Sequence, residues 1–291
     1  MTSIDTKPDC DEGPNTVKID SSQNIWVNCY LMTGSAGGGG LLEYSPTGTL
    51  ENRYPTNSQT ECPSSDSCYF SSWDGAWDAK GHVFAELADG VDETTKQNLT
   101  PGFFWFDAKD PSESPTFIPA GTGYCDPICT IYYMDVDARG NIWFDFVGEG
   151  KDGEGAGLGE VKSPTTKPSV TVVLRAGTYT EPGGVYINDR EQTLNVVERY
   201  HRMLYRYHLP LRAGAKPFET LGPTGVNLAG DGEPNQGGFN KGGTKIALGD
   251  DIGWIDIGTI KTNSWKLVPN VNFVGGVLGA AFTPSDKTAS P

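Results

Sequence analysis

A repeated hairpin is the feature of this sequence that most constrains its fold. Residues 17–30, 75–87 and 133–146 each contain a short apolar run, an Asp-centred tight turn and a second apolar run. An Asp at the start of the turn and a Gly that supplies a positive φ angle are typical of a β-hairpin. Residues 183–198 form a fourth and looser copy. The chain is therefore built from repeats of one structural unit.

A second hairpin follows each copy of the first. Its leading strands are expected at residues 40–45, 102–107, 157–162, 203–208 and 253–258. Two hairpins per unit make a four-stranded antiparallel blade, so the sequence predicts an all-β fold, a β-propeller of five or six blades. A β-sandwich is the alternative, but it does not predict that Asp-x-x-Gly-x-Ile-Trp recurs at matching places in successive units.

The repeat also predicts the organisation of the chain. We expect residues 1–291 to form one propeller domain with an N-terminal tail over residues 1–16. The blades are expected to start near residues 17, 74, 132, 183 and 236. Residues 276–283 read as one further strand, which either closes the ring against the first blade or begins a truncated sixth blade.

The third repeat resembles a known group of propellers. Asp137-Ala-Arg-Gly-Asn-Ile-Trp-Phe144, followed by Gly157-Leu-Gly-Glu-Val161, is similar to a repeat of the streptogramin-lyase and NHL-type propellers, whose architecture the gluconolactonase-like group shares. In overall character, the chain also resembles the secreted propeller enzymes of fungal natural-product pathways, including hetero-Diels–Alderases. These resemblances imply a propeller fold and, for the lactonase-like group, a Ca²⁺-dependent activity.

The cysteines favour an oxidising compartment. The six cysteines include two pairs that are close in sequence, and we expect disulfides Cys62–Cys68, Cys125–Cys129 and Cys10–Cys29, among the other pairings that six cysteines allow. Asn98-Leu99-Thr100 is a glycosylation sequon. The sequence therefore favours a secreted protein or one in the lumen of the secretory pathway.

The charge argues against two classes of partner. A formal net charge of −15 repels phosphate backbones and anionic lipids, so we expect neither nucleic acid nor a membrane as a partner. No run of apolar residues is long enough to cross a bilayer as a helix. A small molecule is the expected partner, and the oligomeric state stays open.

The residues at the start of each inner strand should line one end of the central channel. The long connections between blades are expected at that end, and long loops often carry function. We predict Asp74 and Glu181 as acid–base groups. The substrate-binding residues are predicted to be Trp73, Tyr132, Tyr133, Asp135, Tyr186, Asn235, Gln236, Phe239, Asn240 and Phe273. Packing between blades is the alternative role for the aromatic residues.

A second polar set lies on the second strand of the blades. Its members are Asn28, Glu86, Asp145 and Glu198. Such groups bind a metal, transfer protons or hydrogen-bond backbone amides at blade junctions, and the last role is favoured. The three histidines, His82, His201 and His208, are too scattered to suggest a shared metal site, and Asp250-Asp251 reads as a solvated turn or a contributor to a calcium site.

Three functions are consistent with these patterns. The first is a secreted enzyme that acts without hydrolysis, as a lyase, cyclase or hetero-Diels–Alder catalyst of secondary metabolism, on a small and largely apolar molecule. It would need positioning and acid–base groups, with no covalent nucleophile, metal or other cofactor. The second is a Ca²⁺-dependent hydrolase of lactones or esters. The third is a secreted module that binds glycans or proteins.

Overall fold

The computed structural model describes residues 4–33, 38–56, 68–92, 94–110, 115–121, 128–148, 155–222, 234–240, 242–250 and 254–269. These residues form five four-stranded antiparallel sheets, which are the five blades of a β-propeller. The predicted fold class is therefore confirmed. The expected strand at 276–283 lies outside the described residues.

Each blade is a meander in which neighbouring strands of the chain pair, apart from one insertion in the second blade. Blade 1 contains β1 (Pro14–Ile19), β2 (Ile25–Cys29), β3 (Gly40–Tyr44) and β4 (Leu50–Pro55). Blade 2 contains β6 (Gly75–Trp77), β7 (His82–Leu87), β10 (Gly102–Asp107) and β11 (Thr116–Pro119). Blade 3 contains β12 (Thr130–Val136), β13 (Ile142–Gly148), β14 (Gly155–Lys162) and β15 (Ser169–Tyr179).

The last two blades repeat the pattern. Blade 4 contains β16 (Pro182–Asn188), β17 (Thr193–Glu198), β18 (Met203–His208) and β19 (Glu219–Leu221). Blade 5 contains β20 (Pro234–Phe239), β21 (Lys245–Asp250), β22 (Trp254–Thr259) and β23 (Ser264–Pro269), with the short 3₁₀ helix η2 (Ile260–Thr262) between the last two. The first strands of the five blades begin at Pro14, Gly75, Thr130, Pro182 and Pro234.

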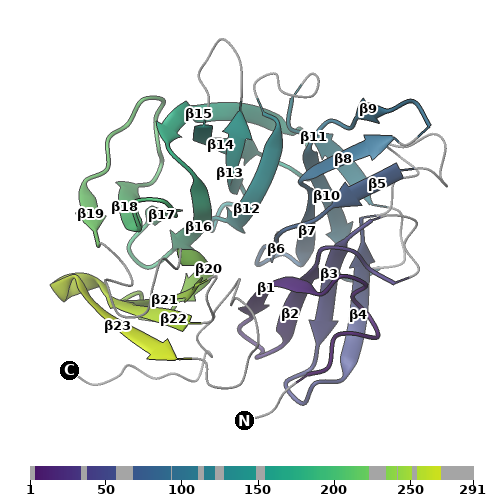
Figure 1. Cartoon of the computed structure of the whole chain (residues 1–291), viewed down its shortest axis with the longest axis horizontal. Coiled ribbons are helices and arrows are strands. Elements are labelled where there is room, and N and C mark those ends of the chain that lie inside the picture. Colours follow the sequence, from purple (N-terminus) through teal and green to yellow (C-terminus); the bar gives the residue numbers. More distant parts are fainter. Residues whose placement is uncertain are drawn as a thin grey trace.

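The inner strands meet around the centre of the molecule (Figure 1). The first strand of each blade is the inner one: β6 contacts β12, β12 contacts β16 and β16 contacts β20. Strand β20 also contacts β1, which brings the last blade back to the first. The described strands thus form a ring of five blades around a channel.

Three short strands outside the blades form a small sheet of their own. Strand β5 (Cys68–Ser71) pairs with β8 (Asp89–Asp92), and β8 pairs with β9 (Gln97–Asn98). These segments flank β6 and β7 in the chain and run side by side beyond blade 2, so their backbone groups bond one another. The sequon residue Asn98 is exposed in β9.

Local hydrogen bonds explain the Asp-centred turns. Asp137 Oδ1 accepts the backbone N–H groups of Arg139 and Asn141 at 2.9 Å each, and Asp137 Oδ2 accepts Trp143 Nε1–H at 3.1 Å. Asp20 makes the equivalent bonds in blade 1, including one from Trp26 Nε1–H. The recurring Asp and Trp of the motif therefore hold each other within one hairpin.

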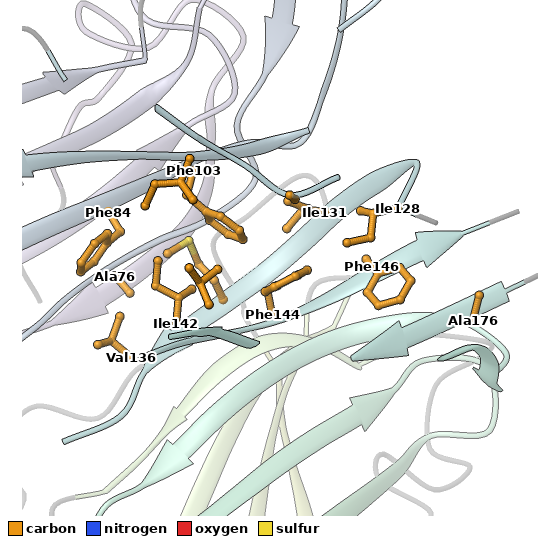
Figure 2. Close-up of a cluster of buried hydrophobic side chains, with 14 residues drawn as sticks. Ala76, Phe84, Phe103, Ile128, Ile131, Val136, Ile142, Phe144, Phe146 and Ala176 are labelled. Carbon is orange, nitrogen blue, oxygen red and sulfur yellow. The ribbon is translucent and has the colours of Figure 1, made fainter. Parts of the chain in front are cut away.

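Large apolar side chains fill the space between blades. Between blades 2 and 3, the rings of Phe103 and Phe144 meet edge to face, with centroids 5.0 Å apart (Figure 2). Ile118, Ile131 and Met134 are buried in the same cluster. Apolar burial of this kind is the main favourable term in folding, so each junction contributes to the stability of the ring.

One disulfide ties the N-terminal segment to blade 1. Cys10 and Cys29 are bonded, with Cα atoms 5.4 Å apart, and Cys10 also pairs with Met32 as an isolated β-bridge. The expected tail over residues 1–16 is thus anchored from Cys10 onward. Cys129 is disulfide-bonded as well. Cys62 and Cys125 lie outside the described residues, so the other two predicted pairings stay predictions.

Candidate functional site

The channel has two different ends. We call the end where the inner strands begin the loop end, because the connections between blades reach it. We call the other end the turn end, because the inner strands finish there in the tight turns at Asp20, Asp78 and Asp137. The predicted site residues divide between these two ends.

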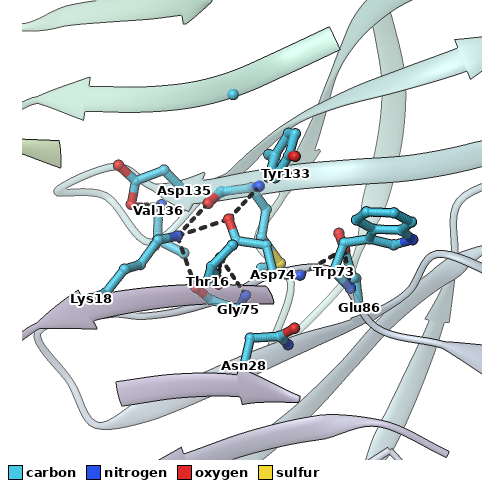
Figure 3. Close-up of polar contacts among 12 residues, drawn as sticks. Thr16, Lys18, Asn28, Trp73, Asp74, Gly75, Glu86, Tyr133, Asp135 and Val136 are labelled. Atoms are coloured by element: carbon cyan, nitrogen blue, oxygen red, sulfur yellow. Dashed lines mark hydrogen bonds and ion pairs between the residues drawn. The ribbon is translucent and has the colours of Figure 1, made fainter. Parts of the chain in front are cut away.

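Asp74 is a saturated carboxylate in the interior of the channel. It is fully buried, and its Oδ1 accepts the Thr16 hydroxyl at 3.0 Å and the Gly75 N–H at 2.7 Å. Its Oδ2 accepts Lys18 Nζ at 2.9 Å and the Met134 N–H at 3.0 Å (Figure 3). The four donors come from three blades, so Asp74 joins these blades.

Lys18 completes this network. Besides Asp74, its ammonium group donates to the carbonyl oxygens of Gly75 and Met134, each at 2.8 Å. An ammonium group has three N–H donors, and three acceptors surround it here. Figure 3 shows Lys18 extending from β1 between Asp74 and Asp135.

The second-strand polar residues bind backbone groups at blade junctions. Glu86 is fully buried, and its Oε1 accepts the N–H groups of Trp73 and Asp74, each at 2.8 Å. Burial raises the pKa of Glu86 well above its usual range, and the charge of Asp74 acts in the same direction. In blade 1, Asn28 Nδ2 donates to the Gly40 carbonyl oxygen at 3.3 Å and to the Ser72 hydroxyl at 2.9 Å. These contacts match the structural role that the sequence favoured for this set.

Buried carboxylates also bind the open edges of the inner strands. An inner strand is a sheet edge, and its outward N–H groups have no partner within their own blade. Three such groups are bound from the preceding blade: that of Met134 by Asp74, that of Gly184 by Asp145 and that of Ile187 by Asp135. Most of the carboxylates near the channel axis therefore hold blades together.

A cavity of about 200 Å³ lies at the turn end of the channel. All five inner strands or the residues beside them contribute to its wall. The lining residues are Lys18, Ile19, Ala76, Trp77, Asp135, Tyr186, Ile187, Gly237, Gly238 and Phe239. A larger hollow of about 430 Å³ lies beside β15 at the outer edge of the propeller, where Arg175 and Lys216 are its charged residues. The inner cavity gathers residues from every blade.

The cavity positions follow a simple rule. In each blade, the residue two places before the Asp or Asn at the first turn lines the cavity; these residues are Lys18, Ala76, Asp135, Ile187 and Gly238. Two of the five are charged, and they carry opposite charges. The small residues Ala76 and Gly238 leave the space that the cavity occupies.

Asp135 is the carboxylate that faces this cavity. Its Oδ1 accepts the Val136 N–H and its Oδ2 accepts the Ile187 N–H, each at 2.8 Å. Burial raises the pKa of Asp135 to about 6; the Asp74 charge raises it too, while Lys18 and the two N–H groups lower it. A carboxyl group with a pKa near neutral pH can accept or donate a proton under ordinary conditions.

The predicted substrate-binding residues are distributed over the whole channel. Asp135, Tyr186 and Phe239 line the turn-end cavity. Trp73 and Tyr132 lie at the loop end, with ring centroids 5.3 Å apart, and the neighbouring Tyr133 is buried. Asn240 lies in the turn of blade 5, where its Oδ1 accepts backbone N–H groups. Asn235 and Gln236 lie in β20. Phe273 lies outside the described residues.

The two predicted acid–base residues lie in different surroundings. Asp74 is buried and saturated, as described above. Glu181 is half-exposed at the loop end, where its Oε1 accepts Arg199 Nη1–H at 3.1 Å. The structure does not bring these two carboxylates into one pocket. Their catalytic role stays a prediction.

The sequence did not single out seven of the cavity residues, namely Lys18, Ile19, Ala76, Trp77, Ile187, Gly237 and Gly238. Aligning the hairpins on the turn residue would have found Lys18, Ile187 and Gly238, because they share one position. Trp77 follows the same logic one residue later. The prediction concentrated on strand starts, whereas the cavity lies at the strand ends.

The histidines and the remaining carboxylates do not form a metal-binding cluster among the described residues. In the described part of the chain, no group of three or more His, Cys, Asp or Glu side chains could hold an ion. His82 bonds Asp78, His201 bonds Glu198, and His208 stacks on Phe218. Asp250, expected in a solvated turn, is instead buried at the end of β21. No helix among the described residues is long and apolar enough to cross a membrane.

Comparison with known proteins supports the fold. No protein-family profile and no curated protein sequence matches this chain. A chain in the crystal structure of a nidogen/laminin complex is similar in structure, with a TM-score of 0.58 and 10% identity, over 91% of this chain and 83% of that one. The Dos1 propeller is similar with a TM-score of 0.52 and 12% identity, over 93% of this chain and 63% of that one.

These similarities show a β-propeller, because at such identities only the fold is shared. This chain spans less than two thirds of the Dos1 propeller chain.

Proposed function

We propose that this protein is a propeller enzyme that holds a small, largely apolar molecule in the turn-end cavity and transfers a proton through Asp135. The observation that carries the proposal is the convergence of all five blades on one cavity with a single carboxylate and a single ammonium group in its wall. Clefts that combine apolar walls with a few converging polar groups are typical of small-molecule sites.

The size and lining of the cavity suit a small substrate. A dry protein cavity of about 150 Å³ is large enough to hold benzene, so a cavity of about 200 Å³ accommodates a molecule of similar or slightly larger size. Trp77, Ile187 and Phe239 supply apolar surface. The backbone at Gly237 and Gly238 lies directly in the wall and offers polar groups to orient the molecule.

Asp135 suits acid–base work because only part of its hydrogen-bonding capacity is used. Each of its oxygens accepts one N–H, and a carboxylate offers about four lone-pair sites. Lys18 lies beside it and favours the charged form. Acid–base assistance by one positioned group accelerates a reaction by roughly 10²–10⁴-fold, which is sufficient for an elimination or a cyclisation without a covalent nucleophile. The resemblance of the third repeat to streptogramin-lyase propellers supports the same reaction class.

Secretion belongs to the same proposal. The disulfide Cys10–Cys29 and the disulfide-bonded Cys129 support an oxidising compartment. Free-thiol titration of the protein purified from a secreting host tests this point. We expect no reactive thiol after denaturation, and six reactive thiols would contradict the proposal.

Binding is tested by NMR with selectively labelled isoleucine methyl groups. Ile19 and Ile187 lie in the cavity wall, and Ile118 lies in the core between blades 2 and 3 and serves as the internal control. Titration with indole, phenol and small terpenoid lactones should shift the Ile19 and Ile187 signals and leave Ile118 unchanged. The replacement Ala76→Phe, which fills the cavity, should abolish the shifts. Equal shifts at all three residues, or none, would contradict the site.

Chemistry is tested separately with Asp135→Asn. Conjugated polyene and lactone substrates that bind by the NMR assay are incubated with each protein, and product formation is measured. We expect the variant to bind within about twofold of the wild type but to turn over about 10²-fold more slowly. Unchanged turnover would remove Asp135 from the reaction while leaving the binding site in place.

A further inference from the structure

A second candidate site lies at the loop end of the channel, the end opposite the turn-end cavity. It is formed by side chains from blades 1 to 4, and we call it the loop-end rim: Tyr30, Trp73, Tyr132, Glu181, Arg199 and His201. Tyr30, Trp73 and Tyr132 form its aromatic part, and Glu181, Arg199 and His201 form its polar part. The contacts among them show that the polar groups are already oriented.

The aromatic part joins three blades. The rings of Tyr30 and Trp73 meet edge to face with centroids 5.8 Å apart, and Trp73 packs at a tilt on Tyr132 at 5.3 Å. All three residues are half-buried. Aromatic rings at such positions offer apolar surface at a small cost in conformational entropy.

The polar part begins beside Tyr132. Glu181 and Arg199 form an ion pair at 3.1 Å, with the Glu181 side chain 41% exposed. Burial raises the pKa of the Tyr132 hydroxyl; the charges of Asp89 and Glu181 raise it further, and Arg199 opposes them. Asp145 accepts the N–H groups of both Tyr133 and Gly184, so the starts of β12 and β16, where Tyr132 and Glu181 stand, lie side by side and the two parts form one surface.

His201 extends the polar part with a fixed orientation. Glu198 is buried, and its Oε2 accepts both the His201 N–H at 2.7 Å and Nδ1 at 2.9 Å. When a carboxylate accepts from Nδ1–H, the neutral ring presents Nε2 as an acceptor. The His201 side chain is 57% exposed, and the adjacent Tyr200 is 63% exposed with its ring edge-on to the imidazole.

This combination fits the chemistry of a sugar. A pyranose has an apolar face of C–H groups that packs on aromatic rings, and its vicinal hydroxyls each donate and accept hydrogen bonds. The planar groups of Glu181, Arg199 and His201 offer adjacent acceptors and donors of the kind that pairs of hydroxyls require. Glu181 and Arg199 neutralise each other in their ion pair, so neither one favours a charged ligand over a neutral one.

We propose that the loop-end rim binds neutral oligosaccharides. The rim crosses four blades, which suits a chain of several sugar units better than a single one. This inference is independent of the turn-end cavity, and each site can fail without the other.

Affinity electrophoresis in native gels tests the proposal. The net charge of −15 carries the protein toward the anode, and a neutral polysaccharide in the gel retards it only if it binds. The probes are laminarin, xylan and mannan, supplemented by an array of neutral oligosaccharides including chitin oligomers. We expect retardation by at least one of these polysaccharides. Failure of every gel and every neutral glycan on the array would overturn the proposal.

Matched variants assign the binding to the rim. Tyr132→Ala should weaken binding about tenfold or more, and Glu181→Gln, an exposed and mild change, should weaken it several-fold. Phe218→Ala removes an aromatic ring that is more exposed than Tyr132, at 45%, in blade 4 outside the rim, and it should have no effect. Asp135→Asn should also have no effect. The proposal fails if Tyr132→Ala and Glu181→Gln are both retarded like the wild type, or if Phe218→Ala loses binding equally.

Discussion

Asp74 and Asp135 are neighbours in the channel with opposite surroundings. Both lie within the influence of Lys18, and both bind a backbone N–H of the next blade. Asp74 is fully buried and accepts from four donors. Asp135 accepts from two donors and faces a cavity. The difference between them is the number of unused lone pairs and their access to a ligand.

This contrast separates structural from functional carboxylates. A buried charge is tolerated only when it is paired and hydrogen-bonded, so a saturated carboxylate has a structural role and little capacity for anything else. A carboxylate with unused capacity, beside a cavity and with a raised pKa, has the properties of a functional group. The four predictions below test this division.

The largest effect is expected for Asp74→Asn. The amide removes the charge that pairs with Lys18 and puts an N–H group where N–H donors already converge. Breaking a buried ion pair by removing one partner costs about 3–5 kcal/mol, so we expect a loss of this size in urea unfolding. A loss below about 1 kcal/mol would show that Asp74 is not the structural member of the pair.

Lys18→Met tests the group that the two carboxylates share. The variant leaves Asp74 and the carbonyl oxygens of Gly75 and Met134 without their common donor, which should cost about 2–3 kcal/mol. Lys18 also lowers the pKa of Asp135, so its removal should move that pKa upward from about 6. Carboxyl ¹³C NMR titration measures the pKa of Asp135, and a lower pKa in the variant would contradict the contrast between Asp74 and Asp135.

Asp256→Asn adds a third kind of carboxylate to the comparison of Asp74 with Asp135, one that is buried without hydrogen-bond partners among the described residues. Asp256 is fully buried in β22, and neither of its oxygens has a hydrogen-bond partner among the described residues. Burial raises its pKa from 3.8 to about 7; the Asp250 charge acts in the same direction, and Arg202 opposes it.

The sign of the pH effect follows from this shift. Because the pKa is higher in the folded state, the folded chain binds more protons between about pH 4 and pH 7, and the contribution of Asp256 to stability is lost as the pH rises through that window. We expect Asp256→Asn to stabilise the protein by about 1 kcal/mol or more at pH 8 and to change little at pH 4. Thermal unfolding of the wild type and the variant at both pH values measures the change in stability. An equal change at pH 4 and pH 8 would exclude a raised pKa of Asp256 in the folded state.

The smallest effect is expected for Gln23→Gly. Gln23 has a φ angle of 71° at the turn position that Gly81 and Gly140 occupy in blades 2 and 3, with φ angles of 89° and 84°. A left-handed conformation costs a non-glycine residue about 1 kcal/mol, so glycine should stabilise the first hairpin by up to this amount. The change leaves Asp74, Asp135 and their hydrogen-bond donors in place, and a loss of ligand binding at the cavity would contradict their assignment as local groups.

The sequence predicted those parts of the fold that depend on short-range contacts. The turn at Asp137 is held by bonds to residues no more than six positions away, which explains why the repeat was visible in the chain. The additional sheet of β5, β8 and β9 was missed because its strands are short and come from two separate connections.

The candidate site was predicted in part. Asp135, Tyr186 and Phe239 were among the predicted residues, but Lys18 was not, because its partners Asp74 and Met134 lie 56 and 116 residues away. Asp74 and Asp135 could not be ranked from the sequence, since both are carboxylates near the inner strands. The number of donors around each depends on which backbone groups the neighbouring blades present.

By itself, then, the sequence determined the hairpin, the blade and their repetition, because local hydrogen bonds and alternating burial are written into consecutive residues. Only the tertiary structure decided that the strand ends form a cavity and that Asp74 is saturated while Asp135 is accessible. Closing the ring brings together strands that are distant in the chain, and this closure sets the donors, the burial and therefore the chemistry of each carboxylate.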